Sequence, residues 1–564
     1  MDKKDFFVLF IFVIIFLNMI LPSLQTRSLY YHEGEFLFLG YSYLKYGNSF
    51  NSNIHPILSF ALVSFPLLFM DIDYPQYNEF NSPKDFGRET FLHYGANDAN
   101  SMVFSGRIVL LFFATLLGLF VYIWSKELFG FKGAIISLIL YTLHPAILAY
   151  TDLMTFDILL ATFFFIAAYF YWKYYLKPCR KYLVLSGIFF GLAVLIKPTS
   201  VVLLFSFFIF NLFIYYKNRL QYIPLKKVIY ILFMISLIGF FVFIFVNLNE
   251  IHPIYNLDDP IYTNAGYARS PERLNLILGD IPFKDKIYFV LTEVPVPAPH
   301  FLQSFYTFNN YLDTGFNSYF NGSYSSGLKS LQYIFVFLVK NPISFLIIFF
   351  LSLFLIKYDK KNKMNVYFIL IFALIYVLSF IFSRIYGGFI YFLPILPLLF
   401  VLAGGLVGFF LNKYLKWIIL GLLFLFIVES LVVYPDYVCY FNQVIEPESS
   451  HKFFIGPDCD LNQDVNRMVD YLNENNIQNA KVNLSVYNFN LKNLNFSYQE
   501  LQGGIHQSGI IVLDANTLEG FYKKDRDNFK WLRDNFEPDV NFGNSIFLYN
   551  ITEDQLKNLE ASNL

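Results

Sequence analysis

The chain has 564 residues, of which 56% are hydrophobic and only 15% are charged. Typical soluble domains carry about 25% charged residues, so this composition excludes an ordinary soluble protein and indicates a chain that crosses a membrane several times. The formal net charge of −1 gives no overall excess of charge that would attract nucleic acid.

Eleven apolar segments approach the length that crosses a hydrocarbon layer of roughly 30 Å. They predict membrane helices at residues 6–24, 102–124, 133–150, 153–172, 182–196, 200–216, 228–248, 342–357, 366–383, 389–411 and 417–434. The first segment could be a signal peptide, but it lacks a clean cleavage site of small residues, and ten further segments follow it. We therefore interpret it as a retained anchor of a polytopic α-helical membrane protein.

Lysine and arginine residues predict how these helices are oriented, because basic connections stay on the cytoplasmic side of a membrane. Alternate connections are basic, beginning with Lys3 and Lys4 before the first segment. The N-terminus is therefore predicted to be cytoplasmic. An odd number of spans then places the loops 25–101 and 249–341, and everything after residue 434, on the outer side of a cell membrane.

The composition becomes polar after Tyr434. Strands are predicted in AKVNLSVY, GIIVLDA and SIFLYNI, and helices in DVNRMVDYLNENN and RDNFKWLRDNF. We therefore expect a transmembrane domain at residues 1–434 and a small extracytoplasmic α/β domain at residues 435–564.

Three cysteines cannot form a disulfide framework. Cys439 and Cys459 could pair with each other on the outer side, whereas Cys179 falls in a predicted cytoplasmic loop. Four Asn-x-Ser/Thr sequences lie on the predicted outer side, although an asparagine-rich chain also produces such matches by chance. They begin at Asn321, Asn483, Asn495 and Asn550.

Asp152 and Asp157 bring carboxylates to the start of the fourth predicted span. An unpaired carboxylate inside a bilayer costs about 2.5–3.5 kcal/mol, so such acids usually face a cavity or a partner. If both residues were helical, five residues at about 100° each would separate their side chains by roughly 140°. We expect Asp157 to face a functional site, whereas Asp152 could be a helix N-terminal residue near water.

Other charged residues lie near predicted outer ends of spans. Arg107 and Lys197 could meet a lipid phosphate there, or their long side chains could simply extend to the interface. His32, Glu33 and Glu35 directly follow the first span, where the simplest interpretation is a set of solvated loop charges.

These candidate residues lie in several sequence blocks that follow one another along the chain. HEGEFLFLGYSYLKYGNSFNSNIHPILSFALVSFPLL contains Glu33 and the His-Pro pair at His55, SGRIVLL contains Arg107, AYTDLMTFDILLATFFFIAAYFYWKYY contains Asp157, and SGIFFGLAVLIKPTSVVLL contains Lys197. PVPAPHFLQSFYTFNNYLDTGFNSYFNGSYSSG and VESLVVYPDYVCYFN complete the series. Together the blocks resemble the dolichyl-phosphate-mannose protein mannosyltransferase superfamily, and within it the prokaryotic members that share the GT-C membrane glycosyltransferase fold with the lipid A aminoarabinose transferases.

The resemblance covers most of the chain and implies a glycosyltransferase. Such an enzyme would transfer a sugar, mannose-like or another hexose or pentose, from a polyprenyl-phosphate donor to an acceptor hydroxyl on the outer face, with inversion. The implied partners are the lipid-linked donor, a protein, glycan or lipid acceptor, and membrane lipids. No cofactor is implied and no metal is expected, since no spacing of histidines and carboxylates here is diagnostic of a metal site.

The resemblance also suggests roles for individual residues. We expect Glu33 to orient the acceptor or to act as the base toward its hydroxyl, a role that His32 could also fill, and Asp157 to position the sugar or a cation that accompanies it. Arg107 and Lys197 would hold the phosphate. Further candidates for substrate binding are His55, which could instead anchor the helix that follows it, Asp152 and Arg384.

The chain departs from the family pattern at three places. His32 stands where the first loop usually has an aspartate, and Ile390 stands where an arginine usually precedes the tyrosine, with Arg384 nearby as a substitute. PDCDLNQDV is a shortened form of an Asp-Ser-Asn block followed by Gln-Asp. These departures leave a catalytically silent homologue or assembly scaffold as an alternative. A secondary transporter is a second alternative, which would need several mid-membrane acids, broken helices and an inverted repeat.

Overall fold

The computed structural model describes most of the chain. The described residues are 2–47, 55–76, 85–217, 225–249, 251–253, 282–298, 301, 318–325, 327, 329–355, 362–484, 497–521 and 523–562. Most of the block PVPAPHFLQSFYTFNNYLDTGFNSYFNGSYSSG lies outside them, and so does Asn495. The chain forms two compact units: the first comprises Met1–Tyr31, Leu111–Ala161 and Thr314–Leu564, and the second comprises His32–Leu110 and Thr162–Asp313.

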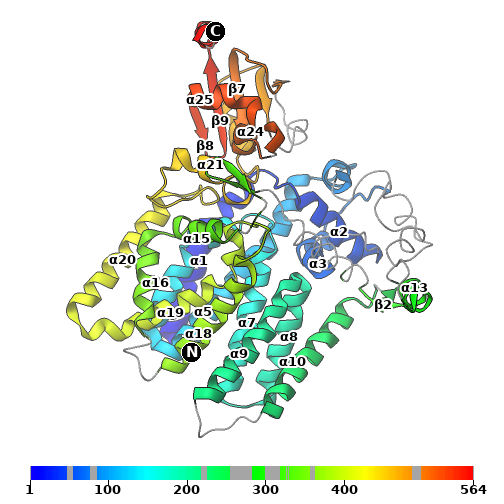
Figure 1. Cartoon of the computed structure of the whole chain (residues 1–564), viewed down its shortest axis with the longest axis vertical. Helices are drawn as coiled ribbons and strands as arrows, with labels where there is room; N and C mark the ends of the chain where they lie inside the picture. The colour runs from blue at the N-terminus through cyan, green and yellow to red at the C-terminus, as the bar shows by residue number, and fades with distance from the viewer. Residues whose placement is uncertain are drawn as a thin grey trace. The chain divides into compact units, whose positions relative to one another are not determined.

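Three of the long apolar helices, α1 (Lys3–Thr26), α18 (Lys363–Ile381) and α20 (Lys413–Val432), lie wholly in the first unit (Figure 1). Its other helices before residue 435 are α6 (Pro145–Ala149), α15 (Ser330–Val339), α16 (Ile343–Leu353), η5 (Phe389–Phe392), α19 (Leu396–Gly404) and η6 (Gly405–Leu411). Helices α5 (Ala99–Thr142) and α7 (Asp157–Leu176) contribute residues to both units. The beginning of α1 is tied to α5, because the buried Asp5 carboxylate accepts hydrogen bonds from Tyr122 Oη (2.7 Å) and Lys126 Nζ (2.6 Å).

The second unit combines three apolar helices with shorter helices of the first loop. Its elements are α2 (Glu33–Tyr46), α3 (Ile57–Ser64), η1 (Phe65–Phe69), η2 (Phe86–Thr90), η3 (Phe91–His93), α8 (Arg180–Ile196), η4 (Pro198–Val201), α9 (Val202–Lys217), α10 (Leu225–Val246), β1 (Ile251–His252), α13 (Lys284–Glu293) and β2 (Val296–Pro297). Helices α8 and α10 lie side by side (Figure 1), and a Cβ atom on Gly191 would lie 2.9 Å from Gly239 Cα. Glycine at this crossing allows the two backbones to approach closely.

The predicted class, a polytopic α-helical membrane protein with a small C-terminal α/β region, is confirmed. Among the described residues, seven helices are long and apolar enough to cross a membrane, or eight if α15 and α16, which meet at 108°, form one span. The predicted count of eleven is not confirmed. Residues 389–411 break into η5, α19 and η6 around Pro394 and Pro397. The predicted spans 102–124 and 133–150 run together in α5, which kinks between them at Gly130, where φ is 74° and ψ is −175°. The orientation in the membrane and the domain boundary at residue 434 stay predictions.

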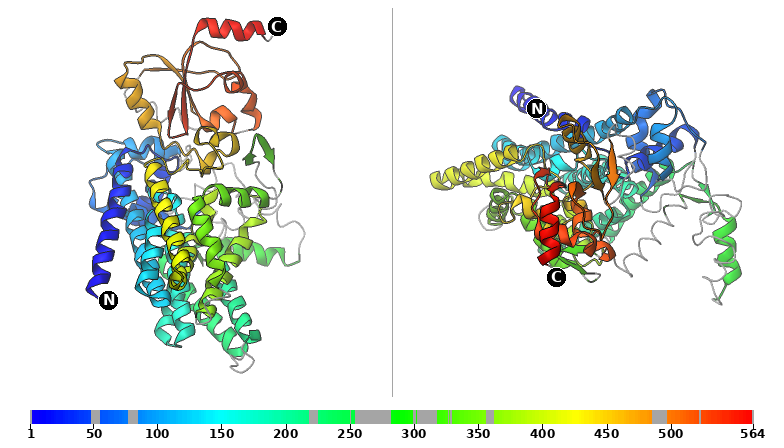
Figure 2. Two further views of the ribbon diagram at one scale, coloured as in Figure 1. Left: turned by 90° about the vertical axis from the view of Figure 1, so that its left-hand side faces the viewer. Right: turned by 90° about the horizontal axis from the view of Figure 1, so that it is seen from above.

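The C-terminal region is built on a five-stranded mixed sheet, in which the predicted strands and helices form. The strands are β5 (Ala480–Asn483), β6 (Tyr498–Glu500), β7 (Gly509–Asp514), β8 (Val540–Phe542) and β9 (Ile546–Ile551), in the order β6-β5-β7-β9-β8. β5 runs parallel to β6 and β7, whereas β9 is antiparallel to β7 and β8. The helices are η7 (Pro447–Ser449), α21 (Ser450–Phe453), η8 (Gly456–Asp458), α22 (Val465–Glu474), α24 (Ala515–Glu519), η9 (Lys523–Phe529), α25 (Lys530–Asn535) and α26 (Glu553–Ser562), which follows the last strand (Figure 2).

Alternation along the central strands builds an apolar core on each face of this sheet. Ile511 and Leu513 of β7 join a cluster with Leu532 of α25, whereas the intervening Val512 joins a cluster with Met468 of α22. Because successive side chains of a strand point to opposite faces, one apolar run supplies both cores. The sheet is therefore covered on both faces.

A hairpin from the middle of the chain packs against this region. β3 (Ser318–Phe320) and β4 (Ser323–Ser325) are joined at Asn321 and Gly322, whose φ values of 46° and 75° suit the two-residue turns that twist with the strands. Tyr319 Oη donates a hydrogen bond of 2.9 Å to the buried Glu519 carboxylate. The hairpin therefore belongs structurally with the C-terminal region.

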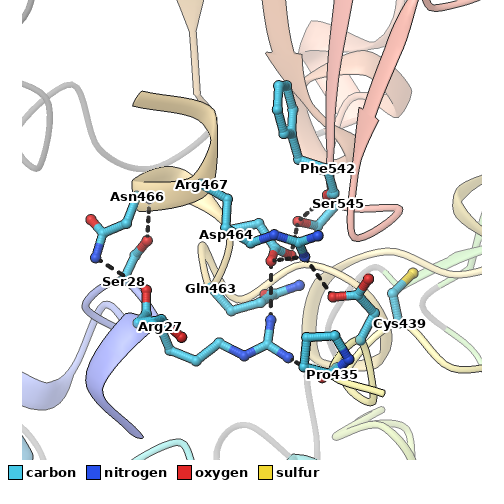
Figure 3. A network of polar contacts seen from close by, with 12 residues as sticks. Arg27, Ser28, Pro435, Cys439, Gln463, Asp464, Asn466, Arg467, Phe542 and Ser545 are labelled. Carbon is cyan, nitrogen blue, oxygen red and sulfur yellow. Dashed lines mark hydrogen bonds and ion pairs between the residues drawn. The ribbon is translucent and has the colours of Figure 1, made fainter. Parts of the chain in front are cut away.

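A buried charge network joins the end of α1 to the C-terminal region (Figure 3). Arg27 Nη1 lies 3.0 Å from Asp464 Oδ1, and Arg27 Nε lies 3.4 Å from Asp152 Oδ2. Arg467 Nη1 reaches the same Asp464 oxygen at 3.0 Å, and the Ser545 hydroxyl donates to the other at 2.7 Å. We call Arg27, Asp152, Asp464, Arg467 and Ser545 the junction network.

Cys439 and Cys459 form a disulfide, as the sequence suggested, and Cys179 is a free thiol. The disulfide joins the segment that follows α20 to the segment before α22, so both ends of this connection are fixed within the first unit.

We predict that Arg27→Gln destabilises the protein much more than Arg467→Gln, although both arginines contact Asp464. The Arg27 side chain is 4% exposed and the Arg467 side chain 39%. Removing the buried partner leaves carboxylates uncompensated and costs about 3–5 kcal/mol, whereas water reaches the partly exposed Arg467 and weakens its contribution. Thermal unfolding of the full chain in detergent measures both variants, and equal shifts would contradict a junction that depends on Arg27.

We also predict an acid-sensitive contribution from His451. Burial, followed by the nearby Lys452 and Arg533 charges, lowers the pKa of His451 from 6.5 to about 3. The unfolded chain takes up this proton below about pH 6.5, so the stabilisation by neutral His451 is complete above that pH and is lost as the pH falls toward 3. The loss amounts to about 2 kcal/mol at pH 5.

The thermal midpoint of His451→Gln should therefore fall less between pH 7.5 and 5 than that of the wild type. His506→Gln is the matched control, since that side chain is one-third exposed. If His451→Gln and wild type kept parallel curves, the assignment to His451 would be wrong.

Candidate functional site

A buried ion pair dominates the first turn of α2 in the second unit. Glu33 is 0% exposed and Arg107, in the third turn of α5, is 1% exposed. Arg107 Nε donates to Glu33 Oε1 at 2.8 Å, and Arg107 Nη2 donates to Glu33 Oε2 at 2.7 Å. The structure thus brings two predicted site residues together, and neither is a solvated surface charge.

This geometry bears on the roles expected for the two residues. A guanidinium that holds both oxygens of a carboxylate makes a strong and well-oriented pair. Since both Glu33 oxygens already accept hydrogen bonds from Arg107, Glu33 is better suited to orienting its surroundings than to taking a proton from an acceptor.

His32, directly before α2, has a different environment. Its Nδ1 lies 2.7 Å from Glu35 Oε2, its ring stacks on Phe36 at 5.5 Å between centroids, and its side chain is 26% exposed. A carboxylate that accepts from Nδ1–H leaves Nε2 as the acceptor nitrogen, which is the arrangement of an oriented histidine base.

A close backbone contact places Arg88 beside this turn. A Cβ atom on Gly34 would lie 2.7 Å from Arg88 Cα, and one on Gly87 would lie 2.6 Å from the Gly34 carbonyl oxygen. Arg88 is buried, and its Nη2 lies 2.9 Å from Glu89 Oε1. The sequence analysis did not identify Arg88. Gly87, which allows the close backbone contact, was the sequence feature that could have pointed to it.

His55 and Lys197 also lie in the second unit. The Ser59 hydroxyl donates to the Ile196 carbonyl at 3.1 Å, which ties α3 to the end of α8, where Lys197 is the C-cap. Burial, then the charges of Lys197 and His32, hold the pKa of His55 well below its ordinary value. His55 is therefore neutral near pH 7 and does not supply a cation for a phosphate.

Asp157 and Asp152 belong to the first unit and have different surroundings. Asp157 is the first residue of α7, is buried, and acts electrostatically on the phenols of Tyr150, Tyr376 and Tyr391. Asp152 precedes the helix, so the predicted start of this span at residue 153 is early, and its carboxylate contacts Arg27 in the junction network. The two carboxylates thus serve different groups of residues.

Arg384, the candidate substitute for the family arginine, lies in the turn between α18 and η5, which passes from an exposed to a buried position. Arg384 is exposed, whereas Ile390 is buried. Tyr386 Oη and the Phe389 N–H both donate to Asp458 of the tail block PDCDLNQDV, at 2.5 and 2.7 Å. Sequence reasoning assigned no role to Asp458 or Tyr386; the polar tail block was the only signal.

Among the residues that the structure describes, no group of three or more His, Cys, Asp or Glu side chains is placed to hold a metal ion. The expectation that the protein needs neither a metal nor a cofactor stays a prediction.

Part of the chain is similar to a known family of proteins. Residues 99–245 match the family model described as dolichyl-phosphate-mannose-protein mannosyltransferase. This stretch contains Arg107, Asp157 and Lys197, and over it the resemblance expected from the sequence is confirmed. No curated protein matches the chain.

Solved structures give a loose overall similarity. The oligosaccharyltransferase of Archaeoglobus fulgidus with Zn and sulfate is 12% identical, over 93% of this chain and 70% of that chain, with a TM-score of 0.47. ArnT from Cupriavidus metallidurans bound to undecaprenyl phosphate is 11% identical, over 97% of this chain and 98% of that chain, with a TM-score of 0.41. The archaeal oligosaccharyltransferase AglB from Archaeoglobus fulgidus, with an inhibitory peptide and a dolichol-phosphate, is 13% identical, over 91% and 70%, with a TM-score of 0.43.

We predict that Glu33→Gln lowers stability and that adding Arg107→Met restores most of the loss. The single change leaves a buried guanidinium without its counter-charge, at a cost of about 3–5 kcal/mol, whereas the double change removes both charges. Thermal unfolding in detergent measures the cycle. Glu89→Gln is the control, because Glu89 pairs with an arginine while its own side chain is 45% exposed.

A Glu33→Gln variant that kept the wild-type midpoint would show that the pair is not a structural unit. The cycle also separates stability from catalysis, because a variant that loses activity only by unfolding could otherwise be taken for a catalytic variant.

Proposed function

We propose that the protein is a membrane glycosyltransferase that moves a sugar from a polyprenyl-phosphate donor to an acceptor hydroxyl on the outer face of the membrane, with inversion. One observation carries the proposal: three charged residues at the ends of apolar helices fall within the stretch that matches the mannosyltransferase family model. They are Arg107 near the start of α5, Asp157 at the start of α7 and Lys197 at the end of α8. The family description names the donor class, a dolichyl-phosphate sugar.

The contacts support an assignment of roles within this reaction. His32 is the base for the acceptor hydroxyl, held by Glu35, because its Nδ1 contact leaves Nε2 to accept a proton. Glu33 and Arg107 form a rigid support for the first turn of α2. Lys197 is the point charge for the departing phosphate, and Asp157, among its phenols, positions the sugar.

A catalytically silent homologue is the second candidate. The observation that favours it is the mutual pairing of Glu33 and Arg107, together with the buried Ile390 at the place of a family arginine. In this candidate the charged residues stabilise the fold and the protein serves as an assembly scaffold.

The two candidates separate in one experiment. The purified full chain is incubated with a panel of radiolabelled polyprenyl-phosphate sugars, and protein, glycan and lipid products are then separated. Transfer from at least one donor supports the enzyme; binding of a donor with no transfer to any acceptor class supports the silent homologue.

We predict that His32→Gln lowers the transfer rate by about 10²–10⁴-fold, the usual contribution of a positioned base. Glu35→Gln should lower it less, because the histidine remains but loses its orientation. Asp98→Asn, an exposed acid in the same predicted outer loop, is the matched control and should transfer like the wild type. Steady-state rates with the radiolabelled donor measure all three, and a fully active His32→Gln would overturn the assignment.

A further inference from the structure

The tail block contacts the turn after α18 through one buried carboxylate. Asp458, in η8, is completely buried, and both of its carboxylate oxygens accept hydrogen bonds from the turn between α18 and η5. We call residues Arg384–Phe389 the η5 turn. The donors are Tyr386 Oη and the Phe389 N–H, so one side chain and one backbone group of this turn depend on the tail.

Asp458 is itself held firmly. The buried Lys340 ammonium donates to the Asp458 carbonyl oxygen and, at 2.7 Å, to the Val438 carbonyl oxygen, and it lies 4.3 Å from the centre of the Phe441 ring. The residues that follow these two carbonyls are Cys459 and Cys439, which form the disulfide. The lysine and the disulfide therefore hold together the same two backbone segments, at residues 438–439 and 458–459.

The η5 turn has little freedom to move. Tyr333 Oη accepts from the Gly387 N–H and donates to the Ile385 carbonyl, both at 3.1 Å. Gly388 has a φ of 85°, and a Cβ atom there would lie 3.0 Å from Pro457, directly before Asp458. Glycine is required at this contact because other residues disfavour that φ and lack the space.

The η5 turn and the neighbouring tail residue Pro457 each contact a tyrosine. A Cβ atom on Gly387 would lie 2.2 Å from Cζ of Tyr391, so the glycine rests on that ring. Tyr150 Oη donates to the Pro457 carbonyl at 3.0 Å. Tyr391 and Tyr150 are two of the phenols on which the Asp157 charge acts.

We propose that Asp458 is a positioning residue: by holding the η5 turn it fixes the ring of Tyr391 that packs on this turn, and the C-terminal tail thereby shapes the part of the protein in which Asp157 is proposed to position the sugar. The catalytic part of this inference rests on the proposed function. A buried carboxylate in apolar surroundings is costly unless its oxygens are satisfied, so its two contacts to the turn are specific requirements and not incidental packing.

Two variants of Asp458 test the proposal against a matched neighbour. Asp458→Leu removes both acceptors, whereas Asp458→Asn keeps the shape and an oxygen for the Phe389 N–H. Asp460→Asn is the control: Asp460 is equally buried in the same block, but its carboxylate accepts from the Asn462 N–H (3.0 Å) and the Asn516 N–H (3.2 Å) in the C-terminal region.

The first measurement is hydrogen exchange of the full chain in detergent, which needs no activity. Asp458→Leu should speed exchange at residues 385–391 by about tenfold or more, because a hydrogen bond to a charged group is lost. Asp458→Asn should speed it less, and Asp460→Asn should leave it unchanged. The inference would be overturned if Asp458→Leu exchanged at residues 385–391 as slowly as the wild type, or if Asp460→Asn sped exchange there by the same factor.

The second measurement is transfer kinetics. Asp458→Leu should lower kcat by about 10²-fold, the cost of a small misplacement in a site, while Asp458→Asn recovers most of the rate and Asp460→Asn keeps the wild-type rate. Faster exchange with unchanged kcat would overturn the positioning role. A wild-type protein that transfers no sugar would refute the proposed function, and the exchange result would still decide on its own whether Asp458 orders the η5 turn.

Discussion

The contact between Arg27 and Asp464 is the interaction on which the arrangement of the first unit depends. A charge removed from water must find an opposite charge and enough hydrogen bonds, or it destabilises the fold by several kcal/mol. Arg27 stands at the end of a membrane helix and Asp464 at the start of the C-terminal region, with Asp152 completing the group from the segment before α7. Three distant parts of the chain are thus placed by one requirement for neutralisation.

The need to neutralise buried charges also acts in the second unit, where it bears on the proposed base. Glu33 and Arg107 neutralise each other in a fork geometry, so the first turn of α2 begins from a fixed point. His32 is the adjacent residue, and Glu35 lies one half-turn further along. A rigid support beneath a partly exposed histidine is what a preorganised base needs, since a base that moves by an ångström loses much of its effect.

Much of the fold was predictable because its signals are local. Apolar runs predicted most of the long helices, short apolar or alternating runs predicted β5, β7 and β9, and the predicted outer position of Cys439 and Cys459 suggested their pairing. The predicted count of spans is not confirmed, because prolines break the apolar run at residues 389–411 and hydropathy alone does not weigh backbone geometry.

The partners of charged residues were much less predictable. Asp152 was predicted as a candidate substrate-binding residue, but it contacts Arg27, which lies 125 residues away in the sequence. Lys340 and Asp458 lie 118 residues apart, and no sequence pattern indicated their contact. Which acid meets which base is decided by tertiary packing. The sequence therefore identified Glu33, Arg107 and Asp157 as unusual charges, without showing that the first two are paired with each other.

The β3–β4 hairpin has a consequence for the order in which this protein is made. Tyr319 emerges from the ribosome 200 residues before Glu519, the acid that receives its hydroxyl, and Tyr324 waits for the backbone of the same residue. The hairpin cannot dock until nearly the entire polypeptide has been translated. Its two tyrosines therefore remain without these partners while about 200 further residues are translated, and the C-terminal region is completed only near the end of synthesis.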